Sequence, residues 1–181
     1  EKFRIEYWAL EEAKLARMPK PKALATRVAL VTGAGSGIGR ATAMAFAAAG
    51  ASVVAADIDR DAVDGTVKEI EAAGGVATAV RCDVTLGADL ERAVAVAVDT
   101  YGGLDAAFNN AGVMAQIAPI ADSTREEWER VIGINLRGVW SCMKHELRHM
   151  SARGGAIVNT SSGAGLVSTT PGMPHYVASK H

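Results

Sequence analysis

The chain is short of aromatic and proline residues, and these shortages limit the classes of protein to which it can belong. Only 5% of its 181 residues are aromatic, and 5 are proline. So little proline excludes a Pro-rich disordered chain. The hydrophobic fraction of 49% comes mainly from Ala and Val. Because small side chains let helices pack closely on a sheet, this composition favours one domain with a well-filled core.

An excess of one charge and long apolar runs are also missing. The formal net charge is −1, which gives no electrostatic basis for binding nucleic acid or an anionic membrane. No apolar run approaches the roughly 20 residues that span a bilayer. Glu1, Lys2 and Arg4 interrupt the N-terminal stretch. We therefore expect no signal peptide and a cytoplasmic location.

Cysteine is scarce and has no metal-binding spacing. Cys82 and Cys142 lie far apart, and neither belongs to a CxxC motif. We expect two reduced, buried thiols. His145 and His149 have the spacing of a metal-binding pair on a helix, but a third ligand is missing. The sequence therefore predicts no metal site.

The N-terminal part of the chain differs from the rest. Residues 1–17 predict a short amphipathic helix, and Pro19-Lys20-Pro21 predicts a stiff linker. The chain does not begin with Met, whereas Met18 precedes the linker. Either the protein starts at Met18, or the helix ends a longer upstream segment. We expect residues 1–25 to form this segment and linker, and residues 26–181 to form the folded domain.

Short apolar strands alternate with helices along that domain. The expected strands are residues 28–31, 52–56, 76–80, 104–108 and 156–159. The expected helices are residues 38–49, 61–73, 90–101 and, capped by Ser123 or Thr124, 126–150. Such continuous apolar runs are typical of parallel strands that are buried on both faces. The order predicts an α/β fold, a doubly wound parallel sheet (Rossmann-like) in three αβα layers.

A glycine-rich turn separates the first strand from its helix. It reads Thr32-Gly33-Ala34-Gly35-Ser36-Gly37-Ile38-Gly39. A pyrophosphate needs free N–H groups at a helix N-terminus, and glycine permits its close approach. No Lys-Ser or Lys-Thr follows the last glycine, which excludes a P-loop. The turn predicts a dinucleotide site with these cofactor-binding residues: Gly33, Ser36, Gly37, Ile38 and Gly39.

An acidic residue ends the second strand. Asp57 can accept hydrogen bonds from both ribose hydroxyls of an adenosine, and it would repel a 2′-phosphate. Ser36 offers that phosphate no positive charge. Arg40 and Arg60 do, and they leave NADP open. The sequence favours NAD over NADP.

Tyr176 and Lys180 are four residues apart, so a helix would place them on one face. A tyrosine is a poor base at neutral pH, and a nearby ammonium group favours its phenolate form. The pair predicts an acid–base site, although a YxxxK pattern is common and a solvated helical pair is the alternative.

Taken together, the motifs resemble those of the short-chain dehydrogenases/reductases. They occur in the family's order as TGxxxGxG from Thr32, Asn109-Asn110-Ala111-Gly112, Asn135, Ser161-Ser162 and Tyr176-xxx-Lys180. The resemblance covers residues 26–181. It is to the single-domain type, because the extended sugar-nucleotide epimerases would need glycine where Ser36 stands.

The resemblance implies a catalytic tetrad. Tyr176 would be the general acid/base, and Lys180 would assist it and hold the nicotinamide ribose. Ser162 would bind the substrate oxygen, and Asn135 would hold a water in the proton relay. The resemblance also implies five further cofactor-binding residues, Asp83, Val84, Asn109, Ala111 and Gly112, of which Asp83 would contact adenine. Tyr176 and Lys180 would bind the cofactor as well.

One spacing departs from the family pattern. The gap from Ser162 to Tyr176 is one residue longer than is typical, and we expect an extra loop residue within 167–174. Ser161 is the alternative catalytic serine. Other candidates have structural interpretations: His175 as a partly exposed loop residue, Trp128 and Trp140 as packing residues, and Asp59, Asp61 and Asp64 as a solvated helix start.

The predicted function is an NAD-dependent oxidoreductase that transfers a hydride between the nicotinamide and an alcohol or ketone. The alternatives are a dinucleotide-binding module without turnover and an NAD-using isomerase or dehydratase. We expect a small-molecule substrate and a homo-oligomer.

Two further expectations concern the ends of the chain. Residues 5–11 and 13–15 weakly resemble the connector of bifunctional rhamnulose-phosphate aldolase/dehydrogenases. The chain ends at His181, directly after Lys180, so we expect a truncated domain whose last helix frays. The fifth strand would be an exposed edge. We therefore expect this fragment to have little or no activity and to aggregate.

Overall fold

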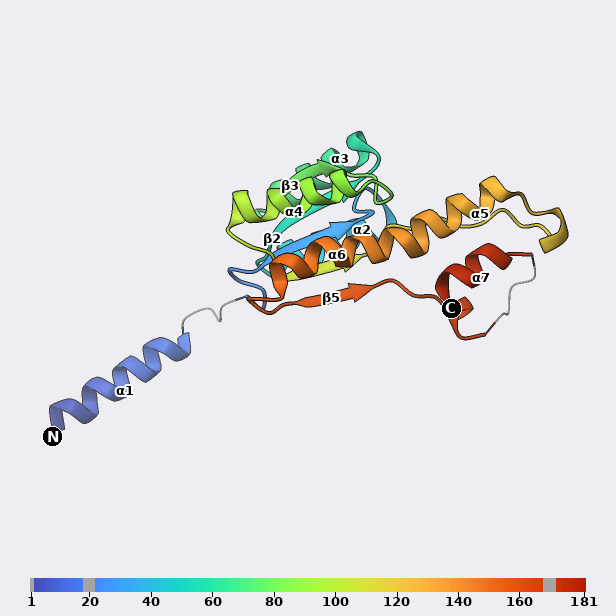
Figure 1. Ribbon diagram of the computed structural model, residues 1–181. Coiled ribbons are helices and arrows are strands. Elements are labelled where there is room, and N and C mark those ends of the chain that lie inside the picture. The colour runs from blue at the N-terminus through green and yellow to red at the C-terminus, as the bar shows by residue number, and fades with distance from the viewer. Residues whose placement is uncertain (1, 18–21, 168–171) are drawn as a thin grey trace.

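The computed structural model describes residues 2–17, 22–167 and 172–181. Its centre is a parallel sheet of five strands in the order β3-β2-β1-β4-β5 (Figure 1). The strands are β1 (Val28–Thr32), β2 (Ser52–Asp57), β3 (Val76–Arg81), β4 (Ala106–Asn109) and β5 (Ala156–Asn159). All five predicted strands are present, with small shifts at their ends.

Seven α-helices complete the described parts of the chain. They are α1 (Lys2–Arg17), α2 (Gly37–Ala48), α3 (Arg60–Ala72), α4 (Gly87–Tyr101), α5 (Arg125–Ile132), α6 (Val139–Met150) and α7 (Pro174–Lys180). The predicted N-terminal helix is therefore present as α1, and its Trp8 and Leu10 side chains are exposed. The predicted linker at Pro19–Pro21 lies outside the described residues. Within the described ranges, no helix is long and apolar enough to cross a bilayer.

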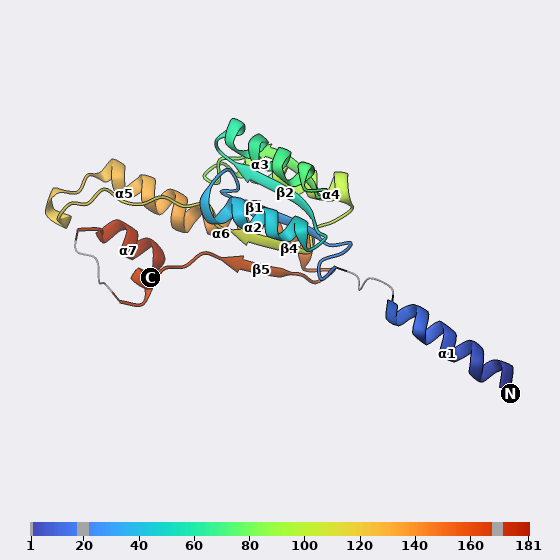
Figure 2. The same ribbon diagram turned by 180° about the vertical axis from the view of Figure 1, so that it is seen from behind.

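Alternating side chains of the strands build two cores. In β1, Val28 and Leu30 join a cluster with α4 and α6, whereas Ala29 and Val31 join one with α2 and α3. Figure 1 shows α4 and α6 in front of the sheet, and Figure 2 shows α2 and α3 in front when the molecule is seen from behind. The predicted three-layer αβα architecture is confirmed.

The long helix predicted over residues 126–150 contains an irregular segment. Between α5 and α6, residues Gly133–Gly138 form a π-helix, so the helical path is continuous but locally wider. Asn135 lies in this segment and bonds both backbone polar groups of Val113. At the start of α5 the Thr124 hydroxyl accepts the N–H of Glu127 at 3.1 Å, so Thr124, rather than Ser123, is the cap.

The outermost strand matches the expected exposed edge. In the described part of the chain, β5 pairs with β4 alone, and its Val158 is 57% exposed.

The strand order places a crevice beyond the carboxyl ends of the central strands. The chain proceeds from β1 to β2 on one side, and β4 pairs with β1 on the other. Loops that leave the carboxyl ends of β1 and β4 therefore diverge. In open α/β sheets this switch point is where ligands bind.

Candidate active site

A cleft of about 560 Å³ opens at the switch point. It brings together most of the residues predicted from the sequence. Those that line it are Gly33, Ser36, Gly37, Ile38, Asp57, Asp83, Val84, Ala111, Gly112, Tyr176 and Lys180. Four predicted site residues are absent from its lining, namely Gly39, Asn109, Asn135 and Ser162.

The glycine turn forms an open cradle at the start of α2. Gly33 and Gly37 have positive φ values of 67° and 51°, which other residues rarely adopt. A Cβ on Gly37 would meet no heavy atom within 4 Å, so this side of the turn faces open space. The Ser36 side chain makes no capping hydrogen bond to α2. The first N–H groups of the helix are therefore left for a ligand, which fits a pyrophosphate.

Gly39 allows α2 to pack closely against the turn. A Cβ at this position would overlap the carbonyl oxygen of Gly33 and lie 2.7 Å from Nδ2 of Asn110. The helix can therefore approach the turn this closely only because residue 39 is glycine. Its contribution to the cleft is indirect.

Asp57 reaches the cleft from the end of β2. Its Oδ2 accepts the N–H of Gly35 at 2.8 Å, and its Oδ1 accepts that of Asp59 at 3.0 Å. A carboxylate can accept about four hydrogen bonds, so acceptor positions remain for ribose hydroxyls. Arg40 forms an ion pair with Glu69, and Arg60 forms one with Asp64. The hydrogen bond from Arg40 lowers the pKa of Glu69.

Asn109 lies beneath the cleft rather than on its wall. It is 1% exposed, and its Nδ2 donates to Glu146 Oε2 and Asn159 Oδ1, both at 3.0 Å. The Glu146 carboxyl is fully buried, and this burial raises its pKa to about 7. The next residue, Asn110, lines the cleft, and its N–H donates to the Thr32 hydroxyl at 3.0 Å.

The helix α7 presents Tyr176 and Lys180 on the same side. The ammonium group of Lys180 lies 6.0 Å from the centroid of the Tyr176 ring. It donates to the carbonyl oxygen of Thr160, directly after β5, at 2.9 Å. The lysine is thus anchored to the sheet while it faces the phenol. That α7 frays stays a prediction.

Asn135 ties α7 to the rest of the site. Its Oδ1 accepts the N–H of Val113 at 2.8 Å, and its Nδ2 donates to the carbonyl oxygen of Val113 at 2.9 Å. The same Nδ2 donates to the hydroxyl of Ser179 at 3.1 Å. The side-chain amide is therefore engaged by protein groups on both sides. With its amide bonded to Val113 and Ser179, Asn135 is buried and does not line the cleft.

Ser162 stands at the beginning of a short 3₁₀ turn over Gly163–Gly165. Its hydroxyl accepts the N–H of Ala164 at 3.2 Å. Ser161, the alternative, is exposed. The extra loop residue expected within 167–174 falls largely on residues 168–171, which lie outside the described residues.

Two structural interpretations of single residues were wrong. His175 is 4% exposed and lies inside α7, where its ring packs edge-on against Trp128 with centroids 5.6 Å apart. It is buried because α7 packs against α5, a contact that has no sequence signature. Trp140 is 60% exposed, with the Lys144 ammonium 5.4 Å above its ring, so it is not a buried packing residue.

The interpretations of Asp59 as part of a helix start and of the cysteines as buried thiols are confirmed. Asp59 accepts the N–H of Ala62 and caps α3. Cys82 and Cys142 are both buried, and burial raises the pKa of the Cys82 thiol to about 12.

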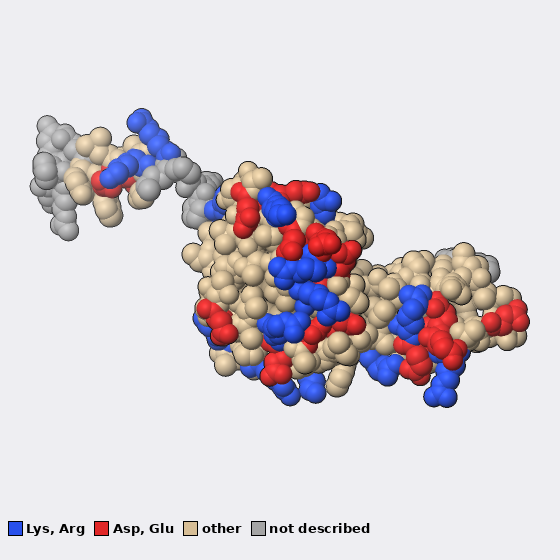
Figure 3. All heavy atoms as spheres, turned by 90° about the horizontal axis from the view of Figure 1, so that it is seen from above, with Lys and Arg blue, Asp and Glu red and all other residues tan. Residues whose placement is uncertain are grey.

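Among the residues that the structure describes, no group of three His, Cys, Asp or Glu side chains could hold a metal ion. Figure 3 shows positive and negative side chains interspersed on the face that it displays.

Several residues at the site were missed by sequence reasoning. Those that line the cleft or hold its residues are Thr32, Val113, Met114, Ile134, Thr160 and Ser179. Thr160 carried a usable signal, because it directly follows the fifth strand at the carboxyl edge of the sheet. The apolar residues carried none.

Comparisons with known proteins agree with this arrangement. A family model described as short chain dehydrogenase matches residues 27–181. Cyclohexanol dehydrogenase of Acinetobacter sp. (strain SE19) is 45% identical over 86% of this chain and 62% of its own length. Cis-4-hydroxycyclohexanecarboxylate dehydrogenase of Sinomonas cyclohexanicum is 47% identical over 81% of this chain and 59% of its own.

Solved structures give the same result. A short chain dehydrogenase/reductase from Burkholderia phymatum in complex with NAD superposes with a TM-score of 0.83 at 39% identity, covering 87% of this chain and 56% of that one. Levodione reductase gives a TM-score of 0.83 at 33% identity, with coverages of 87% and 62%. The chain thus spans 62% and 59% of the lengths of the two curated relatives named above. Because the family model begins at residue 27, the resemblance of residues 5–15 to an aldolase connector stays a prediction.

Proposed function

The chain belongs to the short-chain dehydrogenase family, and from this premise we propose that the whole protein is an NAD-dependent oxidoreductase acting on an alcohol or ketone. One observation carries the proposal. A single cleft collects the glycine turn, the acid that ends β2 and the Tyr176–Lys180 pair. These are the parts that dinucleotide binding and proton transfer require.

The cofactor would lie along the carboxyl edge of the sheet. The turn around Gly37 would hold the pyrophosphate, Asp57 the adenosine ribose, and Lys180 the nicotinamide ribose. When bound, the nicotinamide supplies hydride transfer to or from the substrate carbon. The N–H groups at the start of α2 and the remaining acceptor positions of Asp57 support this fit.

In this proposal Tyr176 moves the hydroxyl proton. It accepts the proton when an alcohol is oxidised and returns it when a carbonyl is reduced. The ammonium group of Lys180 lies 6.0 Å from the centroid of the Tyr176 ring, where it would assist this proton transfer. Ser162 would hydrogen-bond the substrate oxygen. Asn135 would act by holding α7 in place, because its amide is engaged by Val113 and Ser179, and a water of the proton relay would lie near it.

The substrate we propose is a secondary alcohol on a six-membered ring. Two relatives are named for cyclohexanol and for a hydroxycyclohexanecarboxylate. The cleft wall contains the apolar residues Val113, Met114 and Ile134, which suit a ring without charge.

Exposed Leu136, Trp140 and Leu147 support a further proposal, that the protein is a homo-oligomer.

The proposed reaction is tested by supplying the whole protein with cyclohexanol and NAD. We expect NADH absorbance to rise in step with formation of the ketone. Conversion of a substrate without net NADH would instead support the isomerase alternative. Tight NAD binding with no conversion across a panel of ring alcohols and ketones would support a binding module.

The cofactor preference depends, in our proposal, on the charge of Asp57. Asp57→Asn should reduce the ratio of NAD to NADP affinity at least about tenfold, since one charge repulsion near a phosphate is worth about 1.4 kcal/mol or more. Dissociation constants for both cofactors, measured by calorimetry, check this. Asp61→Asn is the matched control, because it removes the same charge from an exposed residue in the first turn of α3. An unchanged ratio in Asp57→Asn would refute the assignment.

A further inference from the structure

Asp89 lies in the first turn of α4, but its side chain binds the preceding loop. Its Oδ2 accepts the backbone N–H of Asp83 at 2.9 Å, two residues beyond the end of β3. The residue is only 7% exposed. A buried carboxylate is retained at little cost only if it is paired and hydrogen-bonded, so its partners indicate what it does.

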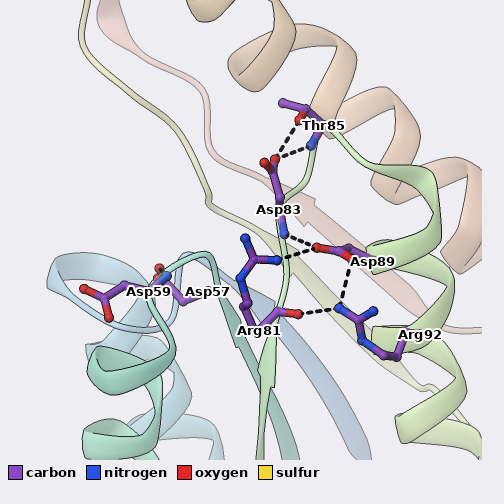
Figure 4. Close-up of polar contacts among 7 residues, drawn as sticks. All are labelled: Asp57, Asp59, Arg81, Asp83, Thr85, Asp89 and Arg92. Carbon is purple, nitrogen blue, oxygen red and sulfur yellow. Dashed lines mark hydrogen bonds and ion pairs between the residues drawn. The ribbon is translucent and has the colours of Figure 1, made fainter.

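Two arginines complete the contacts of Asp89 (Figure 4). Arg92 donates to Asp89 Oδ1 at 2.9 Å and to the carbonyl oxygen of Arg81 at 2.8 Å. Arg81 itself reaches Asp89 Oδ2 at 3.4 Å. The start of α4 therefore holds both ends of the segment from Arg81 to Asp83. The Asp83 N–H and the Arg92 guanidinium also lower the pKa of Asp89, which keeps it ionised at neutral pH.

The held segment forms the cleft wall beside the ribose site. Cys82, Asp83 and Val84 line the cleft. Arg81 pairs in register with Asp57 on the neighbouring strand, so Asp83 lies just beyond the residue proposed to bind the adenosine ribose. A base attached to that ribose would meet this wall.

Asp83 has one oxygen left for a ligand. Its Oδ1 accepts the N–H of Thr85 at 2.9 Å and the Thr85 hydroxyl at 2.7 Å. Among the hydrogen bonds of the described residues, none involves Oδ2. A carboxylate oxygen fixed in this way is suited to accept a hydrogen bond from an exocyclic amino group.

The family resemblance implies that Asp83 contacts adenine. We propose that Asp89 is a positioning residue for this contact: it holds the backbone of Asp83 so that the free carboxylate oxygen of Asp83 is placed to meet the amino group of the base. This inference rests on the proposed dinucleotide function. It assigns to α4 a part in selecting the base, although Asp89 itself does not line the cleft.

The experiment compares two dinucleotides by calorimetry. One is NAD, and the other is nicotinamide hypoxanthine dinucleotide, whose base carries a carbonyl oxygen in place of the amino group. The variant Asp89→Asn keeps the size of the side chain but loses its charge and one acceptor oxygen. Asp99→Asn is the matched control, because it removes the same charge from an exposed position near the other end of α4.

We expect the unaltered protein to prefer NAD to the hypoxanthine dinucleotide. Asp89→Asn should bind NAD about tenfold more weakly, the effect of one good hydrogen bond to a charged group, with little change for the hypoxanthine dinucleotide. Asp99→Asn should match the unaltered protein. Arg92→Met removes the second contact from a half-exposed side chain, and should cause a smaller loss in the same direction.

Two results would overturn the inference. The first is an affinity of Asp89→Asn for NAD within twofold of that of the unaltered protein. The second is an equal loss of affinity for both dinucleotides, which a merely structural role would cause. If Asp89→Asn does not fold, an unchanged base preference in Arg92→Met overturns it. If the unaltered protein binds neither dinucleotide, the proposed function itself fails, and this result is distinct from the others.

Discussion

Replacing Tyr176 with phenylalanine should lower kcat at least about 10³-fold, because general acid–base catalysis contributes about 10²–10⁴-fold and no other phenol lines the cleft in the described residues. The substitution removes one oxygen and keeps the ring that packs against Ala115, Val131 and Met173. NAD affinity should therefore stay within about twofold of the unaltered protein, since base and pyrophosphate contacts lie elsewhere. Steady-state rates with a ring alcohol, beside calorimetric NAD binding, check both values.

Tyr101→Phe is the matched control for this experiment. The Tyr101 hydroxyl shares a 2.7 Å hydrogen bond with the Thr78 hydroxyl, and the residue is absent from the cleft lining. The control loses the same atom and should keep its turnover. If Tyr176→Phe retained the rate of Tyr101→Phe, Tyr176 would not be the acid/base. If Tyr176→Phe lost NAD binding as well, its effect would be on folding or on the cofactor site.

The parallel sheet and its five strands could be predicted because each strand carries its own signal. In β1 every residue from Val28 to Thr32 is buried, and a strand buried on both faces has a nearly continuous apolar run, which here ends at Thr32. The glycine turn was equally informative, since it follows one strand and starts a helix. Positive φ at Gly33 and Gly37 is a local requirement that only the local sequence satisfies.

The parts that could not be predicted depend on contacts between distant segments. The π-helical turn at Gly133–Gly138 forms where Asn135 meets Val113 and Ser179, and periodicity over residues 126–150 gives no sign of it. The burial of His175 has the same origin, because it results from packing against Trp128 on α5. Sequence patterns report the periodicity of one element, whereas these features arise from contacts between two elements.

Asp89 illustrates the same limit at the candidate site. Its position in the first turn of α4 predicts a favourable interaction with the helix dipole, and nothing more. Its bond to the N–H of Asp83 appears only when β3 and α4 are placed together. Motifs thus identify the groups that we propose to meet a cofactor, while the residues that orient those groups are found in the structure.

Gly39→Ala should have the largest effect on stability among single substitutions at the turn. The added Cβ would overlap the carbonyl oxygen of Gly33 and crowd Nδ2 of Asn110. Neither neighbour can move freely, because one is backbone and the other donates to the carbonyl oxygen of Thr32. Overpacking of this kind costs about 3 kcal/mol, which lowers the melting temperature by about 10 °C in a domain of this size.

The same substitution should also abolish NAD binding, since relief of the overlap moves the turn that forms the phosphate cradle. Gly65→Ala is the matched control, because it adds the same methyl group within α3 where no heavy atom lies within 4 Å. It should raise the unfolding free energy by about 0.5–1 kcal/mol, the helix preference of alanine over glycine. Thermal melts and NAD titrations of both variants check the pair. If Gly39→Ala melted and bound NAD like Gly65→Ala, α2 could move away from the turn at no cost. The close contact of helix and turn would then not be what shapes the cradle.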